Sequence, residues 1–432
     1  AKFPNDLAFV QADCDLAARR GDLTRAVAIT QEMDKLAKNA PNGPLNRARI
    51  YAAEGRTREA AAAFDEALQR NPRLLDVRIR LGQTRLKLGE VDEAIRQAKV
   101  VLDVNGNQPD ALLLEAQALA SQGDDDRQKD QSRAQAIALL NGAIVKQPGF
   151  AAAYHEVALL QKQRGQRAES VATLKKNLKE LPNDALGLTL AVEYLTERHA
   201  DGTPASDEEL KDAAALASET DDRDKKGLLA LAVAIGYQKA GQLSLAVPWA
   251  EKAIQKSDTA APHLNYGDLL LSLAEAARDA ATAKRYFEQA VEQYDLVLKV
   301  QANSVEAINN KAWIMHAHLG QGKKALELVQ GLVSRVDPAI LPPEVFDTLG
   351  AILEEQGKAR DAEEAYNKGL RKAPDHPVLN FHMGRLIAAD KGRAGKAARY
   401  LEKANAGRDR LAPTMVEDLD KLTGKLGVTQ AR

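Results

Sequence analysis

The seven histidines are the residues of this chain that could most readily bind a metal or transfer a proton. None of them forms the His-Glu-x-x-His pattern, in which two histidines on one helix face bind zinc. His316 and His318 are two residues apart, so on a helix they are expected to face different directions. We therefore expect no metal site and no cofactor, and we interpret the histidines as surface or groove residues.

A polar run at residues 123–135, GDDDRQKDQSRAQ, contains four aspartates and could suggest calcium binding. It lacks the glycine and the final glutamate of an EF-hand loop, so we do not expect a calcium site. Two other interpretations remain, a domain linker and a lengthened turn. The organisation of the whole chain has to decide between them.

Two further segments could carry chemistry. The run from Gly320 to Lys324, GQGKK, suggests phosphate binding, but it lacks the full Gly-x-x-x-x-Gly-Lys-Ser/Thr pattern and the preceding strand. Cys14 is the only cysteine, and packing as a small hydrophobe is favoured over a role as nucleophile. No Gly-x-Ser-x-Gly motif is present. We expect no enzymatic activity from this chain.

Length and composition narrow the class of protein. With 432 residues, the chain exceeds the usual size of a single core, which favours several domains or a repeat array. A net charge of −1 gives no electrostatic reason to expect nucleic-acid binding. No apolar run approaches the roughly 20 residues of a membrane-spanning helix, so we expect a soluble chain. Residue usage rich in alanine and arginine suggests a bacterial source; periplasm, envelope and cytoplasm all stay open.

The chain has a regular period that must position any functional residue. Gly21, Gly55, Gly89 and Gly123 follow one another at intervals of 34 residues, and a fixed period of 20 to 50 residues is typical of a solenoid. Each glycine separates two apolar-periodic segments. Proline closes several of these segment pairs, where it prevents a helix from continuing. The pattern predicts repeats made of helix, turn and helix.

The repeats resemble the tetratricopeptide family. Residues 41–74 carry that family's spacing of small, aromatic and closing residues at Tyr51, Ala60, Phe64, Ala67 and Pro72. The resemblance implies an all-α fold, a right-handed superhelical α-solenoid. A small residue recurs at the twentieth position of the repeats, where it would let two helices approach closely. These residues are Ala26, Ala60, Ala94, Ala136, Ser170, Ala246, Ala290, Ala325, Ala362 and Ala397.

We predict eleven repeats and a final capping helix at 413–426. An N-terminal array, 1–226, contains repeats 7–40, 41–74, 75–108, 109–150, 151–184 and the degenerate 185–226. A C-terminal array, 227–432, contains repeats 227–260, 261–304, 305–340, 343–376 and 377–408. In the sixth repeat, Ser206 and Glu209 have capping-box spacing and predict a helix near 207–219. The eighth repeat is longer and has no helix breaker, so two overlong helices are expected.

The aspartate-rich run is explained by this register. Gly123 and Ala136 are thirteen residues apart, whereas the corresponding residues of other repeats are five apart, so eight residues are inserted in one turn. The register resumes directly afterwards, which rules out a domain linker. The insertion could extend both helices or form a polar loop, and we expect the loop.

The resemblance implies that the first helix of each repeat faces a concave groove that binds a protein or peptide. The candidate groove residues that follow from the family positions are Arg49, Gln83, Lys87, His155, Asn309, Trp313, His316, Asp347, Glu354, Phe381 and Arg385. Trp313 and Phe381 are the candidate peptide anchors, because aromatic anchors dominate interface energetics. The alternative is that both pack against neighbouring helices.

The resemblance also bears on the kind of partner. Family members that bind chaperone C-termini carry a Lys, Asn and Arg clamp, and it is not reproduced at the corresponding positions. Those positions hold Gln11, Asp15, Asn46, Ile79 and Gln83. Residues 304–404 resemble the closing repeats of large bacterial proteins of this family, some associated with exopolysaccharide export or envelope protein sorting. Ala351 departs from that subgroup, which often has tryptophan there.

We therefore expect a non-enzymatic scaffold that binds a protein or peptide partner. Two alternatives stay open: the recognition arm of a larger enzyme or secretion complex, and a self-assembling homo-oligomer. The first alternative is compatible with a chain that begins at Ala1 without methionine, as a processed or truncated form would.

Overall fold

The structure is a computed structural model that describes residues 6–426, and over this range it is entirely helical, without strands. The chain divides into two compact units between Thr203 and Pro204. We call these the N-terminal unit and the C-terminal unit. The division falls inside the sixth predicted repeat, in the long turn that follows its first helix. Within residues 6–426 no helix has the length and apolar character needed to cross a membrane.

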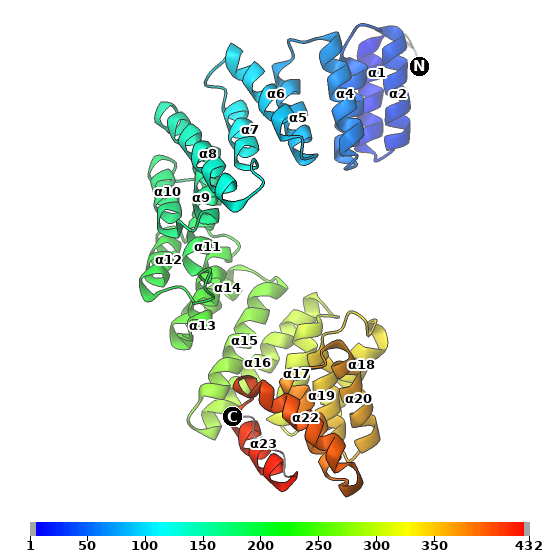
Figure 1. The fold of residues 1–432 in the computed structure, drawn as a ribbon, viewed down its shortest axis with the longest axis vertical. Coiled ribbons are helices and arrows are strands. Elements are labelled where there is room, and N and C mark those ends of the chain that lie inside the picture. Colours follow the sequence, from blue (N-terminus) through cyan, green and yellow to red (C-terminus); the bar gives the residue numbers. More distant parts are fainter. Residues whose placement is uncertain (1–5, 427–432) are drawn as a thin grey trace. The chain divides into compact units, whose positions relative to one another are not determined.

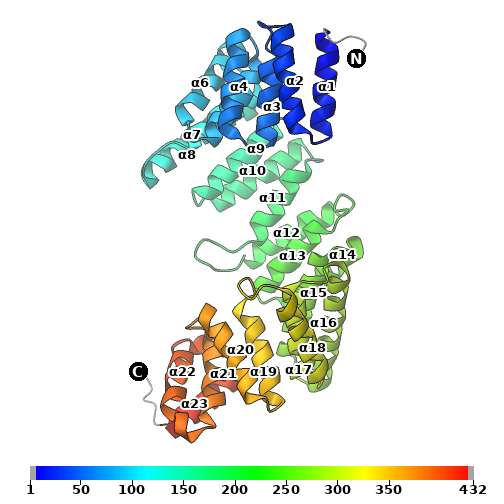
Figure 2. The ribbon, with the colours of Figure 1, turned by 90° about the vertical axis from the view of Figure 1, so that its right-hand side faces the viewer.

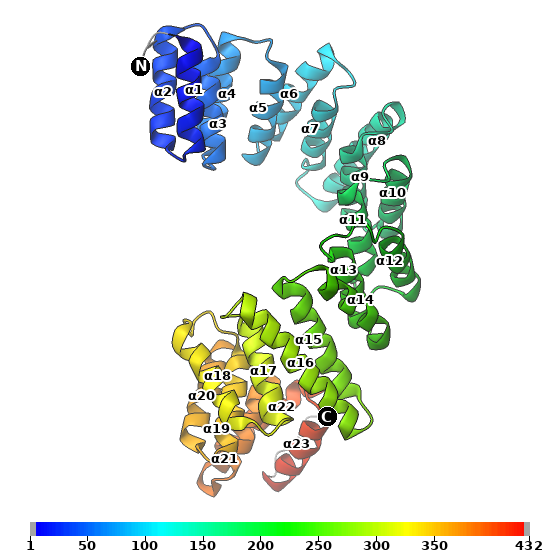
Figure 3. The same cartoon turned by 180° about the vertical axis from the view of Figure 1, so that it is seen from behind.

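The N-terminal unit consists of five packed helix pairs followed by one further helix (Figure 1). Consecutive helices of this unit lie side by side, as Figure 3 shows for the first six. Its helices are α1 (Leu7–Arg19), α2 (Leu23–Leu36), α3 (Asn42–Ala53), α4 (Thr57–Arg70), α5 (Leu75–Lys87), α6 (Val91–Val104), α7 (Pro109–Ala120), α8 (Asp126–Lys146), α9 (Ala151–Gln163), α10 (Arg167–Glu180) and α11 (Ala185–Thr196).

The C-terminal unit begins with one helix, continues with five packed pairs and ends with a single helix. Its longest pair, α15 and α16, lies side by side in Figure 2. Its helices are α12 (Asp207–Glu219), α13 (Leu228–Lys239), α14 (Leu243–Lys256), α15 (Ala260–Ala276), α16 (Ala280–Val300), α17 (Val305–Ala317), α18 (Gly322–Arg335), α19 (Pro343–Glu355), α20 (Ala359–Lys372), α21 (Pro377–Ala388), α22 (Ala394–Ala406) and α23 (Pro413–Leu426), with short 3-10 turns η1 (Lys391–Arg393) and η2 (Arg408–Arg410).

The 34-residue period arises from the turn inside each pair. Gly21 and Gly55 lie between the two helices of their pairs with φ of 75° and 73°. Residues with a Cβ rarely adopt this left-handed conformation, so glycine ends the first helix and lets the chain reverse. The regular spacing of glycines therefore marks the regular spacing of turns.

Close approach between paired helices is confirmed. The small residues at the twentieth position of the repeats are completely buried, from Ala26 to Ala397. Ser170 is the polar member of the set, and its hydroxyl donates a hydrogen bond to the backbone carbonyl of Ala158 at 2.7 Å. A larger side chain at these positions would separate the helices and lose the packing on both sides.

Cys14 is packed in the core of the first pair, with 1% of its surface exposed. Burial, together with Asp15 and Asp13, raises the pKa of its thiol to about 11. Because the thiolate is the reactive form, native protein at pH 8 should react with a disulfide reagent at least about a hundredfold more slowly than free cysteine. Full reactivity should return in denaturant. Equal rates in native and denatured protein would show that this core opens readily.

The structure of most of the irregular segments agrees with the prediction from sequence. α12 begins after Ser206, which forms the expected capping box with Glu209. The eighth repeat contains the two long helices expected, with 17 and 21 residues. The capping helix α23 occupies the predicted residues. All three predictions are confirmed.

The prediction of a polar loop in the fourth repeat is wrong. α8 begins at Asp126 and has 21 residues, so most of the insertion lengthens the second helix, while α7 keeps 12. The Asp125 side chain caps α8 by accepting a hydrogen bond from the Gln128 amide. Arg164, at the end of α9, donates to Asp130 at 2.7 Å. These contacts hold the added turns in a helix, where the sequence offered only polarity as a guide.

Candidate functional site

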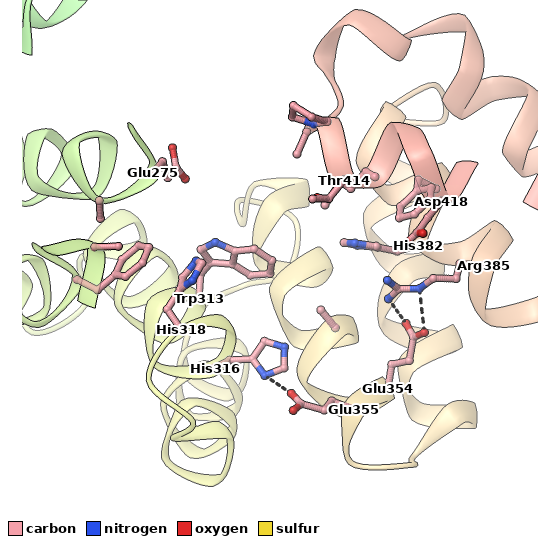
Figure 4. Close-up of a pocket in the computed structure, with 18 residues that line it drawn as sticks. Glu275, Trp313, His316, His318, Glu354, Glu355, His382, Arg385, Thr414 and Asp418 are labelled. Atoms are coloured by element: carbon pink, nitrogen blue, oxygen red, sulfur yellow. Dashed lines mark hydrogen bonds and ion pairs between the residues drawn. The ribbon is translucent and has the colours of Figure 1, made fainter. Parts of the chain in front are cut away.

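The C-terminal unit contains an open pocket of about 1140 Å³. Every first helix of the pairs from α15 to α21 contributes to its wall, and the start of α23 closes one side (Figure 4). This is the face on which the resemblance places a binding groove. The lining residues are Ala274, Glu275, Ala283, Phe287, Trp313, His316, His318, Ala351, Glu354, Glu355, Phe381, His382, Arg385, Ala412, Pro413, Thr414, Met415 and Asp418.

Trp313 is the most prominent side chain of this pocket. It is half-buried, and its ring meets the His316 ring edge-on with centroids 6.2 Å apart. In Figure 4 the indole projects from α17 into the space between Glu275 and the Arg385–Glu354 pair. A partly exposed indole in a cavity offers an apolar surface to a ligand at little conformational cost.

The candidate anchor Phe381 has a different environment. It is 1% exposed and belongs to a core cluster with Leu401 of α22 and Leu419 of α23. The alternative of packing against neighbouring helices therefore describes Phe381. Phe381 lines the pocket but is almost completely buried, so Trp313 is the aromatic residue available to a partner.

His318 lies in the same pocket as His316, but the two rings face different helices, as expected: His316 contacts Glu355 of α19, whereas His318, just past the end of α17, faces α16. Its ring stacks on Phe287 with centroids 3.8 Å apart and planes within 11°. Partial burial of the ring, with a smaller contribution from His316, lowers the pKa of His318.

Most charged residues of the pocket pair with one another. Arg385 donates two hydrogen bonds to Glu354, at 3.2 and 3.1 Å. His316 Nδ1 lies 2.7 Å from the Glu355 carboxylate. Burial nevertheless lowers the pKa of His316, outweighing Glu355, so this contact leaves the carboxylate charge in place.

Glu354 also reaches the second helix of its pair. The Tyr366 hydroxyl of α20 donates to the Glu354 carboxylate at 2.8 Å. Gly350 makes this possible, because a Cβ at that position would overlap the Tyr366 ring. The eighth repeat repeats the arrangement with Gly267, Tyr294 and Asp268, where the hydroxyl donates at 2.7 Å. The combination of a glycine, a buried tyrosine and a carboxylate that accepts its hydroxyl therefore occurs in two repeats.

Glu275 differs from the other carboxylates of the pocket. Among residues 6–426 no side chain pairs with it by a hydrogen bond or ion pair. The residue is exposed, and the partial burial of its carboxyl against the pocket wall raises the pKa of that carboxyl. It lies in the last turn of the overlong α15.

The remaining candidate residues lie outside this pocket. Arg49, Gln83 and Lys87 are exposed on first helices of the N-terminal unit. His155 is partly buried there, with Nε2 2.5 Å from Asp184. Asn309 and Asp347 belong to the C-terminal unit, and Asp347 accepts a hydrogen bond from His382 Nδ1 at 2.7 Å. Five of the candidates do come together in the pocket: Trp313, His316, Glu354, Phe381 and Arg385.

Sequence reasoning missed Glu275, His318, His382 and the α23 residues of the pocket. Glu275 falls on the extra length of α15, which has no counterpart in a 34-residue register. His318 falls just past a helix end. The overlong helices of the eighth repeat were a usable signal, because added turns on a first helix extend the groove wall.

The segments that suggested metal or phosphate chemistry have structural explanations. Within residues 6–426 no group of three or more His, Cys, Asp or Glu side chains is arranged to hold a metal ion. Gly320 and Gln321 form the turn before α18, which begins at Gly322. A helix, not a strand, precedes that turn, so a phosphate loop cannot form there.

Comparison with known proteins identifies the repeats. Residues 51–118 match the family model described as tetratricopeptide repeat, and no curated protein matches the chain. Yeast Tom70 is 13% identical, aligning over 98% of this chain and 96% of that chain with a TM-score of 0.41. Human IFIT1, solved as a dimer with m7Gppp-AAAA, is 14% identical over 90% of each chain, with a TM-score of 0.43.

A third similar structure is TTC0263 from Thermus thermophilus, a thermophilic tetratricopeptide repeat protein. It is 19% identical, covering 58% of this chain and 98% of that chain, with a TM-score of 0.33. These scores are low, so the likenesses carry no inference about ligand or activity. The family match covers α4 to α7, and packed helix pairs with buried small residues continue from there in both units. Residues 51–118 belong to the tetratricopeptide repeat family.

Proposed function

We propose that this chain is a non-catalytic scaffold that binds a peptide segment of a partner protein in the pocket of the C-terminal unit. The observation that carries the proposal is the pocket itself. Its 1140 Å³ exceed what one small side chain would fill, and its walls come from four successive first helices. A segment lying along it would contact several repeats at once, with Trp313 at its centre.

The chemistry of the lining supports binding over catalysis. The only cysteine of the chain, Cys14, is buried in the core of the N-terminal unit and is not accessible as a nucleophile. Arg385 and Glu354 hold each other in a two-point ion pair, which rigidifies a wall. Rigid walls and one accessible aromatic residue are features of a recognition surface.

The proposal is tested by selecting peptides from a random displayed library on the full chain and then measuring the affinity of the selected peptides for Trp313→Ala. Selected peptides should bind the wild type and lose at least about tenfold in affinity for Trp313→Ala, since buried aromatic anchors contribute 2 kcal/mol or more. The matched control is Trp249→Ala, because Trp249 of α14 is also half-buried but lies outside the pocket.

Helicity and thermal unfolding of both variants should match the wild type, since neither indole is fully buried. Two results would overturn the proposal. One is the absence of any enriched peptide. The other is a set of peptides that bind the wild type and Trp313→Ala equally, because their site would then lie elsewhere.

A further inference from the structure

The pocket of the C-terminal unit has an uneven charge. Four carboxylates, those of Glu275, Glu354, Glu355 and Asp418, line it against the single guanidinium of Arg385. Lysine is absent from the lining in the part of the chain that the structure describes. With histidines counted as neutral, this excess of carboxylates makes the pocket negative, although the whole chain carries a formal charge of only −1.

The four carboxylates differ in whether a nearby cation neutralises them. Glu354 is neutralised by Arg385, and Asp418 has Lys421 at 3.1 Å near the solvent. Glu275 has neither a cation nor a hydrogen-bond donor among residues 6–426. Glu275 is exposed to the solvent of the pocket and unpaired, so its carboxylate is accessible to a cationic group of a ligand.

An aromatic surface lies in the same pocket. Trp313 presents a partly exposed indole, and tryptophan is the side chain that attracts cations most strongly through its ring face. In Figure 4 the Glu275 carboxylate and the Trp313 ring face the same pocket, from α15 and α17. A carboxylate and an indole in one cavity suit a lysine or arginine side chain.

An acidic ligand is the competing possibility. The start of α23, at Pro413 and Thr414, lies on the pocket, and a helix N-terminus attracts anions. Arg385 is the only other cationic group there, and Glu354 already occupies it through two hydrogen bonds. The acidic ligand would also face the carboxylates of Glu275 and Glu355. Charge complementarity therefore favours a basic ligand.

We propose that this pocket takes a lysine or arginine side chain of a bound peptide, with Glu275 as its counter-ion and Trp313 as its stacking surface. The inference rests on the proposed function, since it names the class of segment that occupies the same pocket.

The test uses full-length protein in which Trp249→Phe leaves Trp313 as the only tryptophan. Four pools of synthetic decapeptides, random except for a central Arg, Lys, Leu or Glu, are titrated while Trp313 fluorescence is followed. The Arg and Lys pools should bind at least about tenfold more tightly than the Leu pool, and the Glu pool most weakly. The preference should weaken as salt is raised, because the charges are screened.

Variants of the counter-ion separate this inference from simple groove binding. Glu275→Gln should weaken the Arg and Lys pools about tenfold, equivalent to about 1.4 kcal/mol, and leave the Leu pool unchanged. Glu275→Lys should reverse the order in favour of the Glu pool. The control Glu292→Gln removes an exposed carboxylate of α16 outside the pocket and should change nothing.

The outcomes are distinguishable. Binding that quenches Trp313 equally for the Leu and Arg pools, or that ignores Glu275→Gln, rejects a basic ligand and leaves the proposed function standing. Stronger binding of the Glu pool to wild type rejects it in favour of an acidic ligand. If no pool changes Trp313 fluorescence, and displayed peptides also fail to depend on Trp313, both proposals are rejected.

Discussion

Replacing Gly350 by alanine should destabilise the α19–α20 pair by about 3 kcal/mol, at the upper end of the usual cost of overpacking. The added Cβ would overlap the ring of Tyr366, which is completely buried. The ring cannot turn aside cheaply, because its hydroxyl is hydrogen-bonded to Glu354 and that carboxylate holds Arg385. Helix separation is the remaining response, and it loosens the pocket wall as well.

Hydrogen exchange is the suitable measurement for Gly350→Ala, because long repeat arrays need not unfold in one step. Protection should fall most in α19 and α20 and less in pairs farther along the chain, since repeats are stabilised by their nearest neighbours. Gly331→Ala is the matched control. Gly331 lies inside α18 with only the end of the Arg335 side chain near its Cβ position, so alanine there should raise stability by up to about 1 kcal/mol. Equal protection in the two variants would contradict the steric argument.

Removing the carboxylate of Asp184 should destabilise the neighbouring helices of the N-terminal unit by about 3 kcal/mol. Asp184 lies at the start of α11 and is nearly buried, 2.5 Å from His155 Nε2 of α9. It also accepts a hydrogen bond from the Asn177 amide of α10. Asp184→Ala leaves these donors buried without an acceptor, which costs more than the bonds themselves contribute.

The expected loss should appear as reduced hydrogen-exchange protection in α9, α10 and α11. Asp103→Ala is the control, because Asp103 is exposed in the last turn of α6 and its carboxylate has no partner among residues 6–426. That variant should match the wild type within about 0.5 kcal/mol. If both variants lose the same protection, the network around Asp184 has no special role.

The same network predicts a dependence on pH. Burial alone would raise the pKa of Asp184, but hydrogen bonds from Asn177, the Gly187 amide and His155 outweigh it and lower the pKa. A lowered folded-state pKa gives a stabilisation that is complete above the unfolded value, about 3.9, and is lost as the pH falls through the folded value. The difference between wild type and Asp184→Asn should therefore shrink below about pH 4 and stay constant at neutral pH.

The repeat register correctly predicted the positions where close helix packing requires a small residue. Ala60 and Ala362 had to be small because two helices meet there, and that requirement is visible in any single repeat. The capping box of α12 is likewise local, since Ser206 and Glu209 are three residues apart. Such features need no knowledge of what lies elsewhere in the chain.

The remainder depended on contacts between distant residues. α8 is helical through its insertion partly because Arg164, 34 residues away, meets Asp130. Phe381 is buried because α23 folds onto α21 and α22, which its aromatic character alone could not reveal. Glu275 lines the pocket because it lies in the added turns of α15, which have no equivalent position in a 34-residue repeat. Five of the eleven candidate residues reached one pocket, and their pairing with each other was not predictable from helix positions.

The contact among Gly350, Tyr366 and Glu354 links the second helix of its repeat, α20, to the pocket surface formed by the first helix, α19. Because the Tyr366 hydroxyl fixes Glu354, the charge displayed toward a ligand is set partly by a residue that no ligand touches. Among descendants of this sequence, positions 350, 354 and 366 should therefore change together or not at all. A mutation of the buried Tyr366 would then change ligand preference, and a mutational screen limited to the residues that line the pocket would miss it.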